Sequence, residues 1–314
     1  TYRLAGSSDD GEFSLTGSYK ATVELAGLTL TNTSGAAISL LDGKRIDLSV
    51  KKETVNTLKD AAQGEQKGCI ACKGHLELKG KGTLNVYGLA AHAIHSKEYV
   101  EMKNCTVNVL SAVKDGINCN QYFLMESGEL NISGVGDDGI QVEYKDDTDR
   151  DEEDTGALTI DGGTVNVTVT SASSKGIKAI GDLAINGGEV NVVTTGRESE
   201  GIESKAVLTI SGGTVTVSAT DDAINSASHM YLKGGDITAV SSGNDGIDSN
   251  GNMYISGGVI RAFGTSSPEC GIDANEEERY SVIFTGGTLL AVGGGNSVPS
   301  TSASTQPYVS ASMS

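Results

Sequence analysis

The sequence contains no tryptophan, only four phenylalanines and only three prolines among its 314 residues. It has 23 Lys and Arg against 41 Asp and Glu, which gives a formal net charge of −18. So few basic residues argue against nucleic acid as a partner, because phosphates need Lys and Arg. No apolar run approaches the ~20 residues of a membrane-spanning helix. An acidic surface attracts cations such as calcium, although the same charges also fit a solvated surface of a secreted protein.

Cysteine is scarce too, and its five positions are irregular: Cys69, Cys72, Cys105, Cys119 and Cys270. An odd, irregular set is not a disulfide framework. Cys69 and Cys72 form a CxxC, but no second pair and no βαβ pattern accompany it, so we expect buried packing instead of metal or redox chemistry. The chain begins at Thr1 without an initiator Met or a signal-peptide pattern, which is typical of a trimmed sequence.

Glycine, by contrast, is abundant, and one phrase built around it recurs. Its copies are "HAIH" (92–95), "DGIN" (115–118), "DGIQ" (138–141), "KGIK" (175–178), "EGIE" (200–203), "DAIN" (222–225), "DGID" (245–248) and "CGID" (270–273), with "CIAC" (69–72) as a degenerate first copy. Their isoleucines are separated by 24, 23, 23, 37, 25, 22, 23 and 25 residues. A period of this length indicates a stacked repeat.

A second phrase keeps step with the first. Apolar residues alternate on both sides of a Gly-Gly pair in "LTIDGGTVNV" (158–167), "LAINGGEVNV" (183–192), "LTISGGTVTV" (208–217), "MYLKGGDITA" (230–239), "MYISGGVIRA" (253–262) and "VIFTGGTLLA" (282–291). Alternation with period two is typical of strands. The Gly-Gly pair indicates a turn or bend between two of them.

A unit of ~23 residues with three short strands cannot bury its apolar face alone, but stacked units cover one another. We therefore predict a right-handed parallel β-helix over residues 1–292. A propeller blade is longer, at ~40–50 residues, and an antiparallel sandwich would not repeat one phrase so regularly. The predicted inward columns include Leu158, Leu183, Leu208, Met230, Met253 and Val282, a second one through Ile160, a third one from Val165 to Leu289, and the repeated isoleucines.

Two segments depart from the repeat. The 37-residue interval contains an acidic insertion, "EYKDDTDRDEEDT" (143–155), in which Asp147, Asp149 and Asp151 imitate the start of an EF-hand loop. Glu152 and Leu158 stand where that loop needs glycine and the bidentate Glu, so we reject the EF-hand interpretation. The insertion is a calcium-ordered rim or an acidic tip. Residues 293–314 are rich in Gly, Ser and Thr and form a cap or a linker.

Stacking aligns the residues that flank each repeated isoleucine, because neighbouring coils lie ~4.8 Å apart. Two positions before it stand Asp115, Asp138, Lys175, Glu200, Asp222, Asp245 and Cys270, and one position after it stand Asn118, Gln141, Lys178, Glu203, Asn225, Asp248 and Asp273. If the intervening glycine takes a positive φ, both side chains face outward while the isoleucine turns inward. Asp137 and Asp221 add a second carboxylate in two coils.

Carboxylates at this spacing must be protonated, separated or bridged by a cation. Oxygen ligands suit calcium far better than zinc. We predict two calcium clusters, one formed by Asp115, Asn118, Asp137 and Asp138, the other by Asp222, Asn225, Asp245, Asp248 and Asp273. The alternative is a set of solvated residues that favour tight turns.

Lysine interrupts the acidic positions at Lys175 and Lys178, which align with Glu200 and Glu203 one coil later. We favour paired salt bridges there, since each lysine has a matching glutamate. The alternative is a lyase in which one lysine abstracts a proton beside calcium-bound carboxylates.

Tyr231 and Tyr254 align on adjacent strands and should stack. They are either a cross-strand surface pair or, with Arg261, a sugar-binding platform.

The segment "GLTLTNTSGAAISLLDGKRIDLSVKKETVNTLKD" (27–60) and the repeated phrases resemble the calcium-containing, carbohydrate-binding β-helix family of clostridial cell-surface proteins, which are built like pectate lyases. The likeness spans nearly the whole chain. It implies a secreted or cell-surface protein that binds cellulose and acidic plant-wall sugars such as polygalacturonate, without established catalysis. The resemblance supports Asp115, Asp138, Asp222, Asp245 and Asp248 as calcium ligands, and the pattern is broken at His92, Lys175 and Cys270.

The leading functional hypothesis is a monomeric, non-catalytic module for plant cell-wall polysaccharide, in which calcium bridges two anionic partners. A calcium-dependent pectate lyase using Lys175 or Lys178 is the first alternative, and a surface adhesin or scaffold is another. "GDD" (136–138) resembles one motif of polygalacturonases, but the companion motifs of that class are missing.

Overall fold

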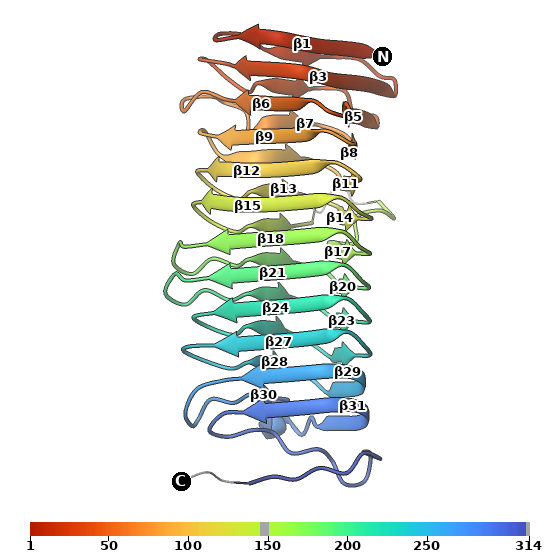
Figure 1. Cartoon of the computed structure of the whole chain (residues 1–314), viewed down its shortest axis with the longest axis vertical. Helices are drawn as coiled ribbons and strands as arrows, with labels where there is room; N and C mark the ends of the chain where they lie inside the picture. The colour runs from red at the N-terminus through yellow and green to blue at the C-terminus, as the bar shows by residue number, and fades with distance from the viewer. Residues whose placement is uncertain (145–150, 312–314) are drawn as a thin grey trace.

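The structure is a computed structural model that describes residues 1–144 and 151–311. The chain winds into a parallel β-helix along one long axis, with the N-terminus at one end and the C-terminus at the other (Figure 1). This confirms the fold predicted from the repeat. The only helix in the described residues is a single 3-10 turn at Glu276–Glu278. No described helix has the length and apolarity that crossing a membrane requires.

Each coil contributes three strands. The first strands form an 11-stranded parallel sheet that we call the isoleucine sheet. Its members are β2 (Phe13–Leu15), β4 (Ile38–Leu40), β7 (Gly68–Cys72), β10 (His92–Ser96), β13 (Ile117–Cys119), β16 (Ile140–Val142), β19 (Ile177–Ala179), β22 (Ile202–Ser204), β25 (Ile224–Ser226), β28 (Ile247–Ser249) and β30 (Ile272–Asp273).

The second and third strands of the coils join into a 20-stranded sheet. Its second strands are β5 (Ile46–Val50), β8 (Leu76–Gly80), β11 (Val100–Lys103), β14 (Tyr122–Met125), β17 (Ala157–Ile160), β20 (Leu183–Ile185), β23 (Leu208–Ile210) and β26 (Met230–Leu232). Its third strands are β6 (Val55–Lys59), β9 (Thr83–Gly88), β12 (Thr106–Ala112), β15 (Glu129–Val135), β18 (Thr164–Val169), β21 (Glu189–Thr194), β24 (Thr214–Ala219) and β27 (Asp236–Ser241). Near the two ends, β1 (Tyr2–Ser8), β3 (Ala21–Thr31), β29 (Met253–Phe263) and β31 (Val282–Val292) complete the sheet.

The core consists of the predicted columns. The repeated isoleucines from Ile70 to Ile272 are at most 1% exposed, and so is the column from Leu158 to Val282. The register pairs each isoleucine with the next along the isoleucine sheet, as in Ile202 with Ile224. The third column ends at Leu289, which is only partly buried in the last coil. Stacking therefore buries identical side chains against one another through the length of the solenoid.

The two kinds of glycine in the repeat serve different purposes. The second glycine of each Gly-Gly pair has a positive φ, for example +84° at Gly188, as expected of a bend. The glycine before the repeated isoleucine does not, so the predicted positive φ is wrong. A Cβ on Gly176 would lie 2.2 Å from Val192 Cγ1 and 2.7 Å from the Gly201 carbonyl oxygen. Lack of space, and not backbone conformation, therefore excludes a side chain there.

An asparagine ladder runs along the third strands and was not recognised in the sequence. The Nδ2 groups of Asn108, Asn131, Asn166 and Asn191 each donate to Oδ1 of the asparagine one coil earlier, beginning at Asn85, over 2.8–2.9 Å. Each amide thereby satisfies its neighbour, in the same way that amide ladders stabilise stacked strands in fibrils.

The insertion and the C-terminal segment are attached to the solenoid. Asp147 and Asp149 lie outside the described residues. Asp151 accepts from Gln121 Nε2 at 3.1 and 3.2 Å. After β31, Ser300 N donates to the Val282 carbonyl at 2.9 Å, so this segment packs on the last coil. The proposed domain boundary at residue 292 and the bounds of the insertion stay predictions.

All five cysteines are free and buried, as expected for packing residues. Burial raises the pKa of the Cys72 thiol to about 12, so the free thiol is protonated at neutral pH.

The Gly-Gly bend generates a stability prediction. We expect Gly188→Ala to lower the free energy of unfolding by about 1–3 kcal/mol, because its Cβ would combine a left-handed φ with a 2.6 Å approach to the Gly163 carbonyl oxygen. Gly43→Ala is the matched control, because nothing lies within 4 Å of its added Cβ. Denaturant unfolding of both variants tests this, and equal stabilities would contradict it.

Candidate metal and glycan site

Two polar columns flank the isoleucine column on the isoleucine sheet. We call them the turn column (His92, Asp115, Asp138, Lys175, Glu200, Asp222, Asp245, Cys270) and the strand column (His95, Asn118, Gln141, Lys178, Glu203, Asn225, Asp248, Asp273), and together the polar stripe. The strand column is aligned residue by residue from His95 to Asp273. The predicted ladders are therefore present, with His92 and His95 as an additional rung.

The turn carboxylates connect successive coils. One oxygen of Asp115 accepts from the Asp138 backbone N at 3.2 Å, and one of Asp222 accepts from the Asp245 backbone N at 3.1 Å. Asp138 and Asp245 repeat the contact with the backbone N of the following coil. Each of these side chains thus fits both interpretations. One carboxylate oxygen fixes the turn through the backbone bond, and the other oxygen is not used in that bond and is a candidate ligand.

This backbone contact also explains why the turn column is more buried than predicted. Asp115, Asp138, Asp222 and Asp245 are only 1%, 3%, 6% and 8% exposed. The outward orientation was predicted for both columns, but mainly the strand column has it. Asp248 and Asp273 of that column are half-buried and so reach the surface.

The N-terminal cluster comprises Asp115, Asp137 and Asp138, whose carboxylates each offer an oxygen within 4.8 Å of the others. Two cationic or potentially cationic groups already face it. His92 Nδ1 lies 3.2 Å from Asp115 Oδ2, and Lys178 Nζ lies 3.6 Å from Asp138 Oδ2. This cluster is thus partly neutralised by the protein itself.

Asn118, predicted as a fourth ligand of that cluster, is occupied by hydrogen bonds. Its Nδ2 donates to Asp115 Oδ2 at 2.9 Å, and its Oδ1 faces His95 Nδ1 at 3.0 Å. Asn118 therefore holds the Asp115 carboxylate in position through its Nδ2 hydrogen bond.

The C-terminal cluster comprises Asp245, Asp248 and Asp273, with mutual oxygen distances within 4.8 Å. No ion pair between a described cation and any of these carboxylates is found. Burial, together with the neighbouring carboxylates, raises the pKa of Asp245 to about 7 and that of Asp248 to about 8. Of the two clusters, this one has no described cationic side chain paired with its carboxylates.

The other two predicted members border the C-terminal cluster. Asn225 Nδ2 donates to Asp222 Oδ2 at 2.9 Å and lies 3.4 Å from Asp248 Oδ2. Burial raises the pKa of Asp222 to about 6. The structure therefore brings all five predicted residues into one neighbourhood, with three carboxylates at its centre.

The donor set of the C-terminal cluster suits a hard cation. Oxygens that bind one calcium ion at 2.3–2.6 Å lie at most about 5 Å apart, which matches the separation of these three carboxylates. Three carboxylates fill only part of a shell of about 6–8 ligands, so other oxygens can complete it. Structural zinc sites are built mainly from cysteine and histidine, and the cluster contains neither.

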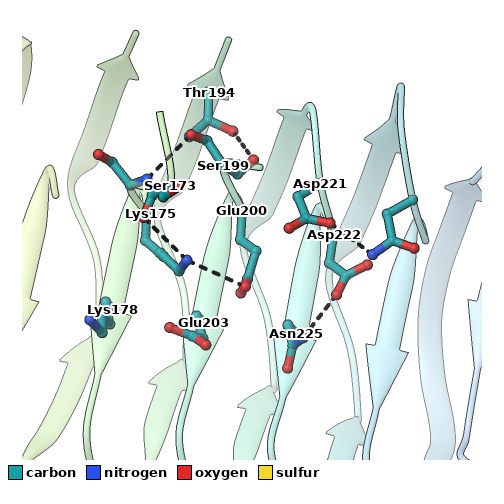
Figure 2. A network of polar contacts seen from close by, with 12 residues as sticks. Ser173, Lys175, Lys178, Thr194, Ser199, Glu200, Glu203, Asp221, Asp222 and Asn225 are labelled. Atoms are coloured by element: carbon teal, nitrogen blue, oxygen red, sulfur yellow. Dashed lines mark hydrogen bonds and ion pairs between the residues drawn. The ribbon is translucent and has the colours of Figure 1, made fainter. Parts of the chain in front are cut away.

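Between the clusters lie the two lysines (Figure 2). Lys175 Nζ lies 3.5 Å from Glu200 Oε1, as predicted. The second predicted pair is wrong, because Lys178 contacts Asp138 of the preceding coil and Glu203 contacts Lys205. Lys205 lies two residues after Glu203 on the same face of the chain, so it reaches that carboxylate locally. Burial raises the pKa of Glu200 to about 7, with Glu203 as a further contributor.

Tyr231 and Tyr254 stack as predicted, with ring centroids 4.8 Å apart and an interplanar angle of 6°. Each ring therefore uses one face on the other, and Lys233 Nζ lies 5.2 Å from the Tyr231 centroid. Arg261 follows the Gly257–Gly258 bend and pairs with Asp236. The contacts are those of a cross-strand pair, and sugar binding by these residues stays a prediction.

With this geometry in view, the comparisons with known proteins can be interpreted. The profile of the family described as "Carbohydrate-binding domain-containing protein" matches residues 1–246, so the chain belongs to that family. A solved structure titled "Structure of the polysaccharide lyase-like protein from C. thermocellum, Gadolinium derivative" is similar in fold, with a TM-score of 0.56 and 24% sequence identity over 67% of this chain and 83% of that chain. A comparison with curated proteins found no significant match.

The raised pKa values of the C-terminal cluster predict a pH dependence of stability. In chelator, folding favours the protonated carboxylates, so stability should be greatest below the unfolded pKa of about 4 and fall as pH rises through about 7 and 8, the folded values at Asp245 and Asp248. Thermal unfolding between pH 4 and pH 9 measures this (roughly the range over which these groups titrate). Asp248→Asn should flatten the profile. A wild-type profile that is already flat would contradict the assignment.

Proposed function

We propose that the protein binds acidic polysaccharide of the plant cell wall through calcium held on the polar stripe, without cleaving it. The observation that carries this proposal is the C-terminal cluster of Asp245, Asp248 and Asp273. No cationic side chain of the described residues pairs with it, and the chain belongs to a carbohydrate-binding family. The cation neutralises these carboxylates and keeps coordination positions for oxygens of the glycan. Asp222 and Asn225 adjoin the cluster and hold its carboxylates in place.

Charge favours an acidic glycan once a cation is bound. A chain with net charge −18 repels polygalacturonate, so association needs a bridge between the two anions. The polar stripe presents carboxylates, amides and ammonium groups but no tyrosine or phenylalanine. Neutral glucans are bound by stacking on aromatic faces, and the Tyr231–Tyr254 pair uses one face of each ring internally. Cellulose is therefore the less favoured ligand.

The location follows from the ligand. Plant cell-wall polysaccharide and millimolar calcium both occur outside the cell, where weak sites with few protein ligands are sufficient. We therefore propose a secreted or cell-surface protein.

The contacts of the lysines favour binding over cleavage. A lyase base must approach the sugar as a free amine, whereas Lys175 pairs with Glu200 and Lys178 with Asp138. Carboxylates around Lys175 also raise its pKa, although burial opposes them, and a raised pKa disfavours the neutral amine that abstracts a proton.

The binding proposal predicts calcium-dependent affinity. Calorimetric titration with polygalacturonate should give saturable heats in calcium and none in chelator. Asp245→Asn combined with Asp248→Asn should reduce affinity at least about tenfold, because truncating partners of a buried charged site costs on the order of 2 kcal/mol or more. Asp9→Asn with Glu12→Gln is the control, since it removes the same charge from exposed residues outside the polar stripe. Equal affinity of the two double variants would contradict the assignment.

The non-catalytic proposal is tested separately. Polygalacturonate incubated with calcium-loaded protein should show no increase in the ultraviolet absorbance of unsaturated uronates. Lys175→Met should not change that result. Product formation that disappears in Lys175→Met would instead establish the lyase.

A further inference from the structure

Four lysines gather beside the N-terminal end of the polar stripe, and none of them forms an ion pair with a described residue. They are Lys67, Lys73, Lys97 and Lys114, all exposed. Lys20, Lys59 and Lys81 likewise form no ion pair with a described residue, so the notable feature is that these four lysines gather in one place. Elsewhere on the isoleucine sheet, Lys175, Lys178 and Lys205 are all paired.

These lysines line two adjoining hollows. The first, which we call the lysine hollow, has a volume of ≈ 290 Å³. Three lysines and one carboxylate line it, so its net charge is positive; the lining residues are Leu41, Glu65, Gln66, Lys67, Ala71, Cys72, Lys73, His95 and Lys97. The second has a volume of ≈ 350 Å³ and lies over the N-terminal cluster. Lys67 and His95 line both. Volumes near 300 Å³ are at the lower end of small-molecule sites.

The lysine hollow exists because of one small residue. Ala71 occupies the position that His95 occupies in the next coil and Ser39 in the preceding one. An alanine between them leaves space over the sheet, and the flanking lysines of β7 and β10 border that space. The polar stripe thus changes from carboxylates to ammonium groups at this end.

His95 adds a hydrogen-bond acceptor without a donor. Asn118 Nδ2 donates to the Asp115 carboxylate, which only accepts, so Asn118 Oδ1 must accept from His95 Nδ1–H. His95 Nε2 therefore carries a lone pair, and it has no hydrogen-bond partner in the described structure. His95 is only 4% exposed, so this acceptor is buried. A buried acceptor of this kind needs a donor such as a hydroxyl group.

We infer that the lysine hollow is a subsite for an acidic sugar, with the sugar carboxylate beside Lys67, Lys73 and Lys97 and a sugar hydroxyl directed toward His95. This inference rests on the proposed function and specifies where a second contact with the same polysaccharide lies. The lysines attract the carboxylate directly, without calcium, whereas the aspartate clusters need the ion. A chain that continues into the adjoining hollow reaches Asp115 and Asp137, so one polysaccharide uses both kinds of contact.

The test uses a galacturonate trimer and its methyl-esterified form, which lacks the charge. Lys67→Gln, Lys73→Gln and Lys97→Gln combined should weaken binding of the charged trimer about five- to tenfold, since each exposed ionic contact is weak on its own and three of them are lost. The matched control changes Lys20, Lys59 and Lys81 to Gln, because these residues are exposed and line neither hollow. Ala71→Leu should also weaken binding, by filling the hollow without altering charge.

The outcomes separate the inference from the proposed function. If wild-type protein binds polygalacturonate in calcium but the triple variant binds the trimer as tightly as its control, the lysine hollow is wrong and the proposed function stands. Equal losses for the charged and esterified trimers would also overturn it, because the site would not recognise carboxylate. If wild-type protein binds neither ligand, both proposals fail. Unchanged melting temperatures establish that the variants fold.

Discussion

Every feature of this molecule depends on the spacing between stacked coils. Parallel strands lie about 4.8 Å apart, so each side chain has its equivalents from the adjacent coils as nearest neighbours. For apolar residues this is favourable, and the isoleucine column is buried along its length. For asparagine it is favourable as well, because an amide is both donor and acceptor and satisfies the amide above it. For a carboxylate, the same arrangement places like charges together.

The magnitude of that repulsion explains the unusual electrostatics of the polar stripe. Two unit charges 4.8 Å apart repel by about 3 kcal/mol at an effective dielectric constant near 20, which corresponds to about 2 pKa units. Burial is the larger cause at Asp245 and Asp248, and this repulsion adds to it, so that their pKa values rise to about 7 and 8. The turn aspartates remain in place because one oxygen binds the backbone of the next coil. The backbone contact thus fixes the carboxylates where their charge is unfavourable.

The fold could be predicted from the sequence, and the reason is physical. Register in a solenoid is set by repetition, so spacing alone aligned the strand column from Asn118 to Asp273. What repetition does not specify is where flexible side chains turn. Lys178 had a glutamate beside it in register yet contacts Asp138, and Glu203 contacts Lys205. The glycine before the isoleucine was also misinterpreted, because the packing of Gly139, Gly176 and Gly201 against a valine of the third strand depends on the cross-section of the coil.

The candidate site, like the fold, could be predicted only where register determines it. The identity of the clustered carboxylates followed from register, whereas the lysine hollow escaped recognition because its residues come from the degenerate first coils. Ala71 aligned with His95 was the available signal, since a small residue beside a large one in the same column predicts a gap.

The repulsion between carboxylates along the polar stripe is reduced in three ways. At Lys175 and Lys178 the sequence places ammonium groups between the two acidic clusters. At the N-terminal cluster, backbone N–H groups and the Asn118 amide donate to the aspartate oxygens. At the C-terminal cluster the described chain supplies no cation, so protonation or a bound ion must take that role. A lysine and a calcium ion are alternative solutions to one electrostatic problem, but only the ion has free coordination positions. The coils that lack lysine are therefore the ones suited to bridging an acidic glycan, whereas the unpaired lysines beside His95 suit its direct contact.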